Sequence, residues 1–275
     1  MSELRQHIDE TAKVIQAECA LQPQVGVILG TGLNGLAAQL DVEARLSYTK
    51  LPHFAVSTVE SHAGELLLGH LAGKPVVAMS GRFHRYEGYS LGQVTFPVRV
   101  MRALGVDVLV AFNAAGGLNP QFRAGDIMVI EDHINFMGDN PLIGPNDDAL
   151  GPRFPDMSQP YTRDLIDLAE TLALEMGIKL QKGVYLACPG PCLETRAEYR
   201  MMRTLGADVV GMSTVPEVIV AVHGGMKVLA FSVITDECFP DALEPVEIEK
   251  IIATANGAEP KLTKLVRACI ERLPG

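Results

Sequence analysis

Short apolar segments rich in valine, isoleucine and leucine recur along the whole chain and alternate with segments of helical periodicity. They lack the strict polar–apolar alternation of a half-exposed strand, so we expect strands buried on both faces. The expected strands cover residues 25–29, 66–71, 75–79, 106–112, 127–131, 184–187 and 228–235. The expected helices cover residues 3–20, 91–104, 161–176, 195–205, 216–223 and 246–272. This alternation predicts an α/β fold with a largely parallel or mixed central β-sheet flanked by helices.

The 275 residues fit one large α/β domain, although they exceed the roughly 100–200 residues of a typical domain. Hydrophobic residues make up 48% and charged residues 20%, which is ordinary for a folded protein. The longest irregular stretch, residues 135–160, is rich in glycine, proline, asparagine and aspartate. Strands and helices alternate on both sides of it, so it is predicted to be a functional loop inside one domain spanning residues 1–275.

The balance of charges disfavours several classes of partner. Thirty-three acidic and 23 basic residues give a net charge of −10, which repels nucleic acid and anionic membranes. An anionic ligand would therefore need a locally positive site. No apolar run approaches the roughly 18–20 residues that span a bilayer, and the N-terminus is polar, unlike a signal peptide. We expect a cytoplasmic protein that binds neither nucleic acid nor a membrane.

The five cysteines do not form the pattern of a disulfide framework. Their number is odd and they are spread over the length of the chain, so we expect reduced thiols. Cys188 and Cys192 are the one close pair, and the Pro-Gly-Pro between them predicts a loop. No second Cys/His pair lies at zinc-finger spacing, so we expect no metal site.

A glycine-rich turn follows the first expected strand. Residues 30–35 read Gly-Thr-Gly-Leu-Asn-Gly, a spacing that brings backbone N–H groups against a phosphate. A dinucleotide site would also need an acidic residue at the end of the next strand, and residues 48–51 offer none. Two interpretations stay open: a turn that needs glycine for its geometry, or a phosphate site with the Thr31 hydroxyl as a further donor.

Basic side chains gather in residues 81–88, directly after the expected strand at 75–79. Arg82, His84 and Arg85 lie there together with Tyr86. In an acidic protein such a cluster is suited to hold an anion, because a guanidinium matches phosphate oxygens with two parallel hydrogen bonds. The alternative is a solvated surface loop. His62 counts toward the same site only if the fold brings it there.

Other polar residues stand at the ends of expected strands, where ligands bind in open α/β sheets. Asn113 and Ala114 begin a run of small residues, which leaves backbone N–H groups approachable or else forms a tight turn. Residues 132–133, Asp-His, suggest a metal site or a catalytic triad, but neither a G-x-S-x-G nor an H-E-x-x-H motif accompanies them. Taken singly, Glu194 could be a helix-start carboxylate and Met212 a core residue.

Taken together, these segments resemble the trimeric purine nucleoside phosphorylase family over nearly the whole chain. The most specific ones are GRFHRYEGYS, FNAAGGLNP, DHINFMG with GPND, and GMSTVPEVIVAVH. The resemblance implies the nucleoside phosphorylase fold and cleavage of inosine, guanosine and their deoxy forms by phosphate. The products would be the free purine base and ribose 1-phosphate, as in purine salvage. It further implies a homotrimer that uses inorganic phosphate as co-substrate, with no cofactor and no metal.

The resemblance also implies roles for single residues. Phosphate would contact Thr31, His62, Arg82, His84, the backbone N–H of Ala114 and Ser213. The nucleoside would contact Tyr86, Asn113, Phe154, Leu193, Glu194, Met212, Asp236 and Ile248. His84, Glu194 and Asp236 would be catalytic, and Phe154 would come from the neighbouring subunit. As the glycosidic bond lengthens, phosphate would offset positive charge on the ribose and hydrogen bonds would offset negative charge on the purine.

Four positions depart from the common pattern of the family. Thr31 replaces a serine, and Leu193 stands where an aromatic residue often packs on the base. Asp236 replaces the asparagine frequent in enzymes selective for 6-oxopurines, and Ile248 replaces a histidine that often meets the ribose 5′-hydroxyl. Methylthioadenosine phosphorylases are similar in having an acid and an apolar residue at these last two places.

Three alternative functions follow. One is a phosphorylase for methylthioadenosine or methylthioinosine. A dinucleotide-dependent dehydrogenase is disfavoured by the missing ribose-binding acid. A nucleoside-binding protein without catalysis is disfavoured because binding alone would not require a full set of phosphate ligands.

Overall fold

The computed structural model describes residues 1–30, 34–56 and 63–273. Its strands are β1 Val25–Ile28, β2 Asp41–Ser47, β3 Glu65–Leu71, β4 Lys74–Ser80, β5 Val108–Gly117, β6 Ile127–Asn135, β7 Leu180–Ala187, β8 Val209–Gly211 and β9 Lys227–Glu237. Its α-helices are α1 Glu3–Glu18, α2 Asn34–Ala38, α3 Leu91–Ala103, α4 Arg163–Glu175, α5 Arg196–Thr204, α6 Val215–His223 and α7 Ile248–Glu271. Two short 3-10 helices are η1 Tyr48–Lys50 and η2 Arg85–Glu87.

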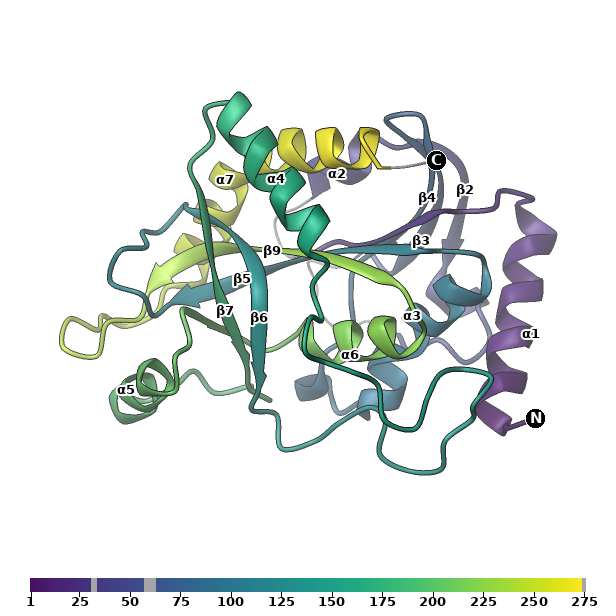
Figure 1. Ribbon diagram of the computed structural model, residues 1–275, viewed down its shortest axis with the longest axis horizontal. Helices are drawn as coiled ribbons and strands as arrows, with labels where there is room; N and C mark the ends of the chain where they lie inside the picture. The colour runs from purple at the N-terminus through teal and green to yellow at the C-terminus, as the bar shows by residue number, and fades with distance from the viewer. Residues whose placement is uncertain (31–33, 57–62, 274–275) are drawn as a thin grey trace.

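One mixed sheet of nine strands runs through the described part of the chain, in the order β2-β3-β4-β1-β5-β8-β7-β6-β9. Strand β9 also pairs with β5, so the last five strands of this order close into a barrel. In Figure 1 helices α4 and α7 lie above the sheet and α3 and α6 below it. The predicted α/β class with a mixed sheet flanked by helices is therefore confirmed.

Every expected strand and helix is present, with ends that shift by a few residues. The sequence patterns missed the edge strand β2 because only continuous apolar runs were expected to be strands, whereas residues 41–47 alternate between polar and apolar, the pattern of a half-buried strand. They also missed α2 and β8, which are too short to show a period.

Strands β5 and β9 extend further than expected, and this corrects one alternative interpretation. Residues 113–117 are strand rather than a tight turn, because β5 stays paired with β9 as far as Gly117 opposite Glu237. The parallel strands β4, β1, β5 and β9 all end at the same edge of the sheet. The carboxyl ends of four strands therefore meet in one region.

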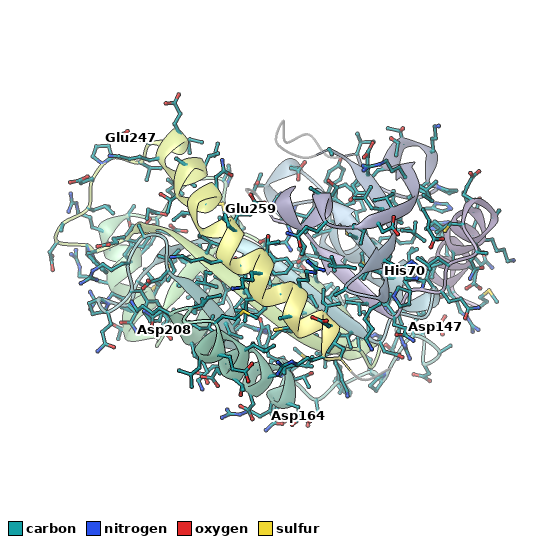
Figure 2. The ribbon with its side chains drawn as sticks, turned by 90° about the horizontal axis from the view of Figure 1, so that it is seen from above. His70, Asp147, Asp164, Asp208, Glu247 and Glu259 are labelled. Carbon is teal, nitrogen blue, oxygen red and sulfur yellow. The ribbon has the colours of Figure 1, made fainter. Side chains whose placement is uncertain are left out.

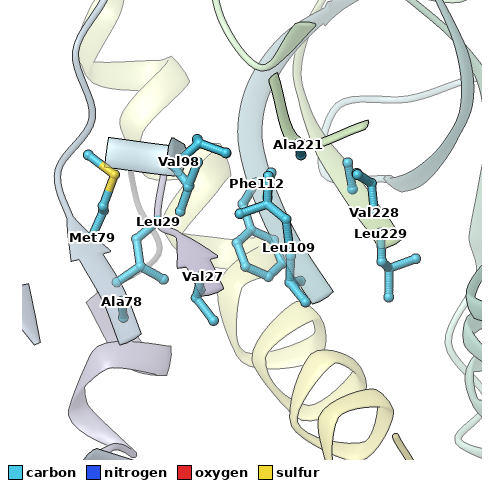
Figure 3. Close-up of a cluster of buried hydrophobic side chains, with 14 of the residues drawn as sticks. Val27, Leu29, Ala78, Met79, Val98, Leu109, Phe112, Ala221, Val228 and Leu229 are labelled. Carbon is cyan, nitrogen blue, oxygen red and sulfur yellow. The ribbon is translucent and has the colours of Figure 1, made fainter. Parts of the chain in front are cut away.

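Apolar side chains fill the space between the sheet and the helices. Figure 3 shows Val27 and Leu29 at β1, Met79 of β4 and Phe112 of β5 packed together, all of them at most 2% exposed. The Phe112 ring stacks on that of Phe231 with centroids 6.0 Å apart. Burying side chains of this size contributes roughly 1.5–3 kcal/mol each, so the core holds the strand ends in a fixed relation.

Helix α7 crosses the molecule and reaches the glycine-rich turn. Figure 2 shows Glu247 at its amino-terminal end and Glu259 along its length. The Glu259 carboxylate accepts a hydrogen bond from the backbone N–H of Gly35, which ties α7 to the first turn of α2.

Gly30 marks the point where the end of β1 packs against the backbone of β5. A Cβ added there would lie 2.8 Å from the carbonyl oxygen of Phe112, closer than side-chain carbons approach. Glycine is thus needed at this position for close packing, in agreement with the geometric interpretation. Thr31 lies outside the described residues.

We expect Gly30→Ala to lower the free energy of unfolding by about 1–3 kcal/mol, because backbone of β5 must move to admit the methyl group. Gly257→Ala is the matched control, since Gly257 lies in α7 with nothing within 4 Å of an added Cβ. It should raise the stability by about 0.5–1 kcal/mol through helix propensity. Urea unfolding of both variants tests this, and equal effects would contradict the packing argument.

Candidate active site

A cavity of about 360 Å³ opens at the carboxyl ends of the parallel strands. Eleven of the predicted site residues line it: Arg82, His84, Tyr86, Asn113, Ala114, Leu193, Glu194, Met212, Ser213, Asp236 and Ile248. They come from segments far apart in the sequence, which the sheet brings to one edge. A cavity of about 470 Å³ between α1, α3 and α6 is larger, but it contains none of these residues.

Arg82 lies at the buried end of the cavity and is only 2% exposed. Its Nη1 donates to the hydroxyls of Ser213 at 2.7 Å and Thr214 at 3.0 Å. Its Nε lies 3.5 Å from Oε1 of Glu217, whose side chain is equally buried. Removing one partner of such a buried ion pair costs about 3–5 kcal/mol, so the guanidinium is firmly held. A fixed positive charge thus faces the cavity in a protein of net negative charge.

The backbone at Thr214 is strained and orients the hydroxyl groups around Arg82. Thr214 has φ 70° and ψ −53°, a region that non-glycine residues rarely occupy. The N–H of Val215 donates to the carbonyl of Ser213 at 2.8 Å, which completes a γ-turn. The Thr214 hydroxyl also accepts from Nδ2 of Asn113 at 2.9 Å. Strain of roughly 1–3 kcal/mol at such a place is typical of a binding site.

The basic cluster of residues 81–88 divides between the cavity and the surface. Oε1 of Glu87 accepts from the backbone N–H of His84 at 2.7 Å and lies 3.1 Å from its Nδ1. This contact orients the imidazole ring. The ring stacks on Tyr86 with centroids 4.6 Å apart. Arg85 points elsewhere, 4.0 Å from Asp139.

Two carboxylates line the opposite end of the cavity. Oδ1 of Asp236 accepts from the Thr235 hydroxyl at 2.8 Å, and Oδ2 accepts from the Cys238 thiol at 3.1 Å. Glu194 accepts from the Cys188 thiol at 3.0 Å. Burial, together with the hydrogen bond to Glu194, raises the pKa of Cys188 to about 12, so this thiol keeps its proton at neutral pH.

Sequence reasoning missed several residues at this end. Thr235, Tyr199 and Cys238 line the cavity, and Cys188 lies directly behind Glu194. Asp236 and Cys238 are two positions apart at the end of a strand, and residues at this spacing share one face. This two-residue spacing could have indicated Cys238 from the sequence.

An apolar wall closes a third side of the cavity. Ile248, Ile251 and Ile252 contribute to it from the first turns of α7. Ile248 is 62% exposed, which is unusual for isoleucine. Of the three, only Ile248 was predicted, although spacings of three and four residues place the others on the same helix face.

Three predicted positions do not join the cavity in this structure. Thr31 and His62 lie outside the described residues. Phe154 is 86% exposed on the loop between β6 and α4, where the Arg153 guanidinium lies 5.7 Å from its ring centroid. Arg153 in turn donates to the carbonyl oxygens of Leu142 and Gly144, at 3.2 and 2.8 Å. The loop is therefore braced while Phe154 projects from it.

In the Asp-His pair at residues 132–133, the histidine makes a structural contact. Nδ1 of His133 lies 3.1 Å from the Tyr161 hydroxyl, and burial lowers the pKa of His133. Within residues 1–30, 34–56 and 63–273, no three His, Cys, Asp or Glu side chains are placed to hold a metal ion. Nor does this part of the chain contain a helix long and apolar enough to cross a membrane.

A family model of the phosphorylase superfamily matches residues 24–271. The chain belongs to this superfamily. Purine nucleoside phosphorylase 1 of Bacillus subtilis (strain 168) is 51% identical over 267 residues, which cover 97% of this chain and 98% of the relative. The purine nucleoside phosphorylase of Rattus norvegicus is 49% identical over 271 residues, or 96% of this chain and 94% of the relative.

Solved structures also match this chain and agree with its assignment to the phosphorylase superfamily. Purine nucleoside phosphorylase of Schistosoma mansoni in complex with adenosine matches with a TM-score of 0.93 and 41% identity, over 98% of both chains. The same enzyme in complex with inosine matches with the same score and identity, over 98% of this chain and 97% of that one. The family resemblance drawn from the sequence segments is thereby confirmed, as is the nucleoside phosphorylase fold.

Proposed function

We propose that this protein is a purine-nucleoside phosphorylase that cleaves inosine, guanosine and their deoxy forms to the free base and ribose 1-phosphate. One observation carries the proposal: a single cavity joins a buried arginine and its hydroxyl partners at one end to two carboxylates at the other. The first end suits an anion and the second suits the polar edge of a purine. The relatives near 50% identity carry the same name.

Phosphate is proposed to bind at the Arg82 end. Arg82 and Ser213 offer a charged donor and a hydroxyl 2.7 Å apart, with His84 and the backbone N–H of Ala114 beside the same cavity. A dianion needs this many donors because it leaves a strong hydration shell. Thr31 and His62 remain proposed as further contacts. Inorganic phosphate is thus a co-substrate, and no other cofactor is proposed.

The nucleoside is proposed to span the rest of the cavity. Tyr86, Asn113 and Met212 would line the ribose, while Glu194 and Asp236 would bind the purine and Leu193 would cover it. As the bond between C1′ and N9 breaks, its electron pair passes to the purine and a phosphate oxygen bonds to C1′. Phosphate offsets the positive charge on the ribose, and hydrogen bonds at the base offset the negative charge.

The apolar wall favours a second candidate substrate class. Ile248, Ile251 and Ile252 offer no hydrogen bond to a ribose 5′-hydroxyl but would pack against a 5′-methylthio group. Methylthioadenosine or methylthioinosine is therefore the alternative substrate. Relative rates on inosine, guanosine, adenosine and methylthioadenosine separate the two candidates.

The assembly is proposed to be a homotrimer in which Phe154 completes the neighbouring subunit's site. An exposed aromatic ring on a braced loop is suited to such a contact. A role in purine salvage follows from the proposed products, and a cytoplasmic location stays a prediction from the sequence.

We expect base release from inosine to require phosphate. Arg82→Ala should lower kcat/KM, because about 2–4 kcal/mol of transition-state stabilisation is lost. The loss should appear mainly in the phosphate dependence, since the purine end is untouched. Arg85→Ala is the matched control, because its side chain lies outside the cavity. Equal rates in phosphate-free buffer would refute phosphorolysis.

We expect mixed trimers to recover activity when Arg82→Ala chains are combined with Phe154→Ala chains, because some interfaces then pair an intact cavity with an intact Phe154. Activity is assayed after mixing and reassociation. As a control, chains that carry both substitutions go through the same mixing and reassociation and should recover no activity. A monomer in light scattering at assay concentrations would rule out the shared site.

We expect Asp236→Asn to move preference toward inosine. An amide carries N–H groups that can donate to N7 of the leaving purine, whereas an ionised carboxylate can only accept. The measurement is kcat/KM for inosine and adenosine, compared with the parent enzyme. An unchanged ratio would show that Asp236 does not contact the base.

A further inference from the structure

The apolar wall of the cavity is reached by an irregular segment, residues 239–247, which we call the wall segment. Strand β9 ends just before it at Glu237, and α7 begins directly after it at Ile248. Figure 1 shows the loop that follows β9 beside α5, at one end of the molecule. Because Ile248 lines the cavity, the position of the wall segment decides where the apolar wall lies.

Arg196 fastens the wall segment to α5. Its Nη1 donates to the carbonyl oxygen of Pro240 at 2.6 Å, and its Nη2 donates to that of Leu243 at 3.2 Å. Arg196 is the first residue of α5, and Leu193 and Glu194 shortly before it line the cavity. One side chain outside the cavity thus connects two separate parts of its lining.

The other contacts of the wall segment are weaker. In the part of the chain that the structure describes, no residue besides Arg196 hydrogen-bonds to this segment from outside it and α7. Arg200 lies 3.7 Å from Asp241, but both side chains are more than half exposed, and such ion pairs contribute little. Leu243 packs, only partly buried, against the small apolar cluster that includes Tyr199. The fastening therefore depends mainly on Arg196.

The charges of the two elements suit each other. The wall segment contains Asp241, Glu244 and Glu247 and no basic residue. Arg196 and Arg200 lie one turn apart on α5, so they share a face of the helix. A guanidinium presents its donors as a planar fork, which can serve two carbonyl oxygens at once, whereas an ammonium is a single point charge.

We propose that Arg196 is a positioning residue for the nucleoside, because it holds the wall segment on α5 and thereby keeps Ile248 in place against the ribose. This inference rests on the proposed phosphorolysis and adds a residue that itself contacts no substrate. Without Arg196, the wall segment would be in place in only a fraction of the molecules, and the apparent affinity for the nucleoside falls with that fraction. The Arg82 end is built from other elements, so phosphate binding should not change.

The kinetic test varies phosphate and, separately, the nucleoside that the unmodified enzyme cleaves fastest. If the wall segment of Arg196→Ala is in place in about one tenth to one fifth of the molecules, KM for the nucleoside rises about five- to tenfold. The values of kcat and of KM for phosphate should stay within about twofold, since the lost contact acts on bound substrate and transition state alike.

Three further variants separate hydrogen bonding from packing and charge. Arg196→Met keeps an apolar stem without donors and should behave like Arg196→Ala. Arg196→Lys keeps one donor group and should give an intermediate KM. Arg203→Ala is the matched control, because it removes the same charge from an exposed position in the last turn of α5 and should leave KM unchanged.

A second test measures the fastening without any substrate. Glu244 and Glu247 are exposed in the wall segment, so a glutamate-specific protease can cut there when the segment opens locally. Arg196→Ala should be cut at these two residues about five- to tenfold faster than the unmodified enzyme, and Arg203→Ala at the unmodified rate.

The outcomes are distinct. A lower kcat with both KM values unchanged would indicate only a smaller folded fraction and would overturn the positioning role. A methionine variant that behaves like the unmodified enzyme, or unchanged cutting at Glu244 and Glu247, would overturn the fastening by Arg196. If the unmodified enzyme cleaves no nucleoside with phosphate, the proposed function itself fails, whereas faster cutting of Arg196→Ala would still support the fastening.

Discussion

Parallel pairing joins β5 to β9 from Val108 opposite Lys227 to Gly117 opposite Glu237, and the cavity depends on it. Because both strands run in the same direction, their carboxyl ends come together while their apolar middle residues lie in the core. The pairing also closes the last five strands into a barrel. Asn113 and Asp236 thereby become part of one cavity wall, although more than a hundred residues separate them.

The Arg82 end of the cavity shows how a buried charge is kept in place. Burying a guanidinium is unfavourable unless it is paired and hydrogen-bonded. Here Glu217 supplies the opposite charge, while Ser213 and Thr214 supply oxygen acceptors. The strained turn at Thr214 is the conformational cost of aiming these hydroxyls. Such an arrangement is organised before any anion arrives, which is the condition for strong electrostatic stabilisation.

At the opposite end, the surroundings of a residue matter as much as its identity. A carboxylate offers two oxygens to a ligand, and the protein neighbours of these oxygens decide which lone pairs the ligand can reach. Thr235 and Cys238 are those neighbours in this chain. Family resemblance identifies Asp236 as a departure from the common pattern, but only its contacts indicate what the departure does.

The sequence by itself determined the fold class, nearly all the long elements and most of the cavity residues. Arg82, His84 and Asp236 could be found because polar residues at the end of a buried apolar strand stand out in the amino-acid sequence. The tertiary structure decided which neighbours act on them. Cys188, Tyr199 and Ile251 escaped prediction because each is an ordinary core or helix residue in the sequence. Their roles arise from distances across the fold, and short-range patterns carry no information about which distant segments the sheet brings together.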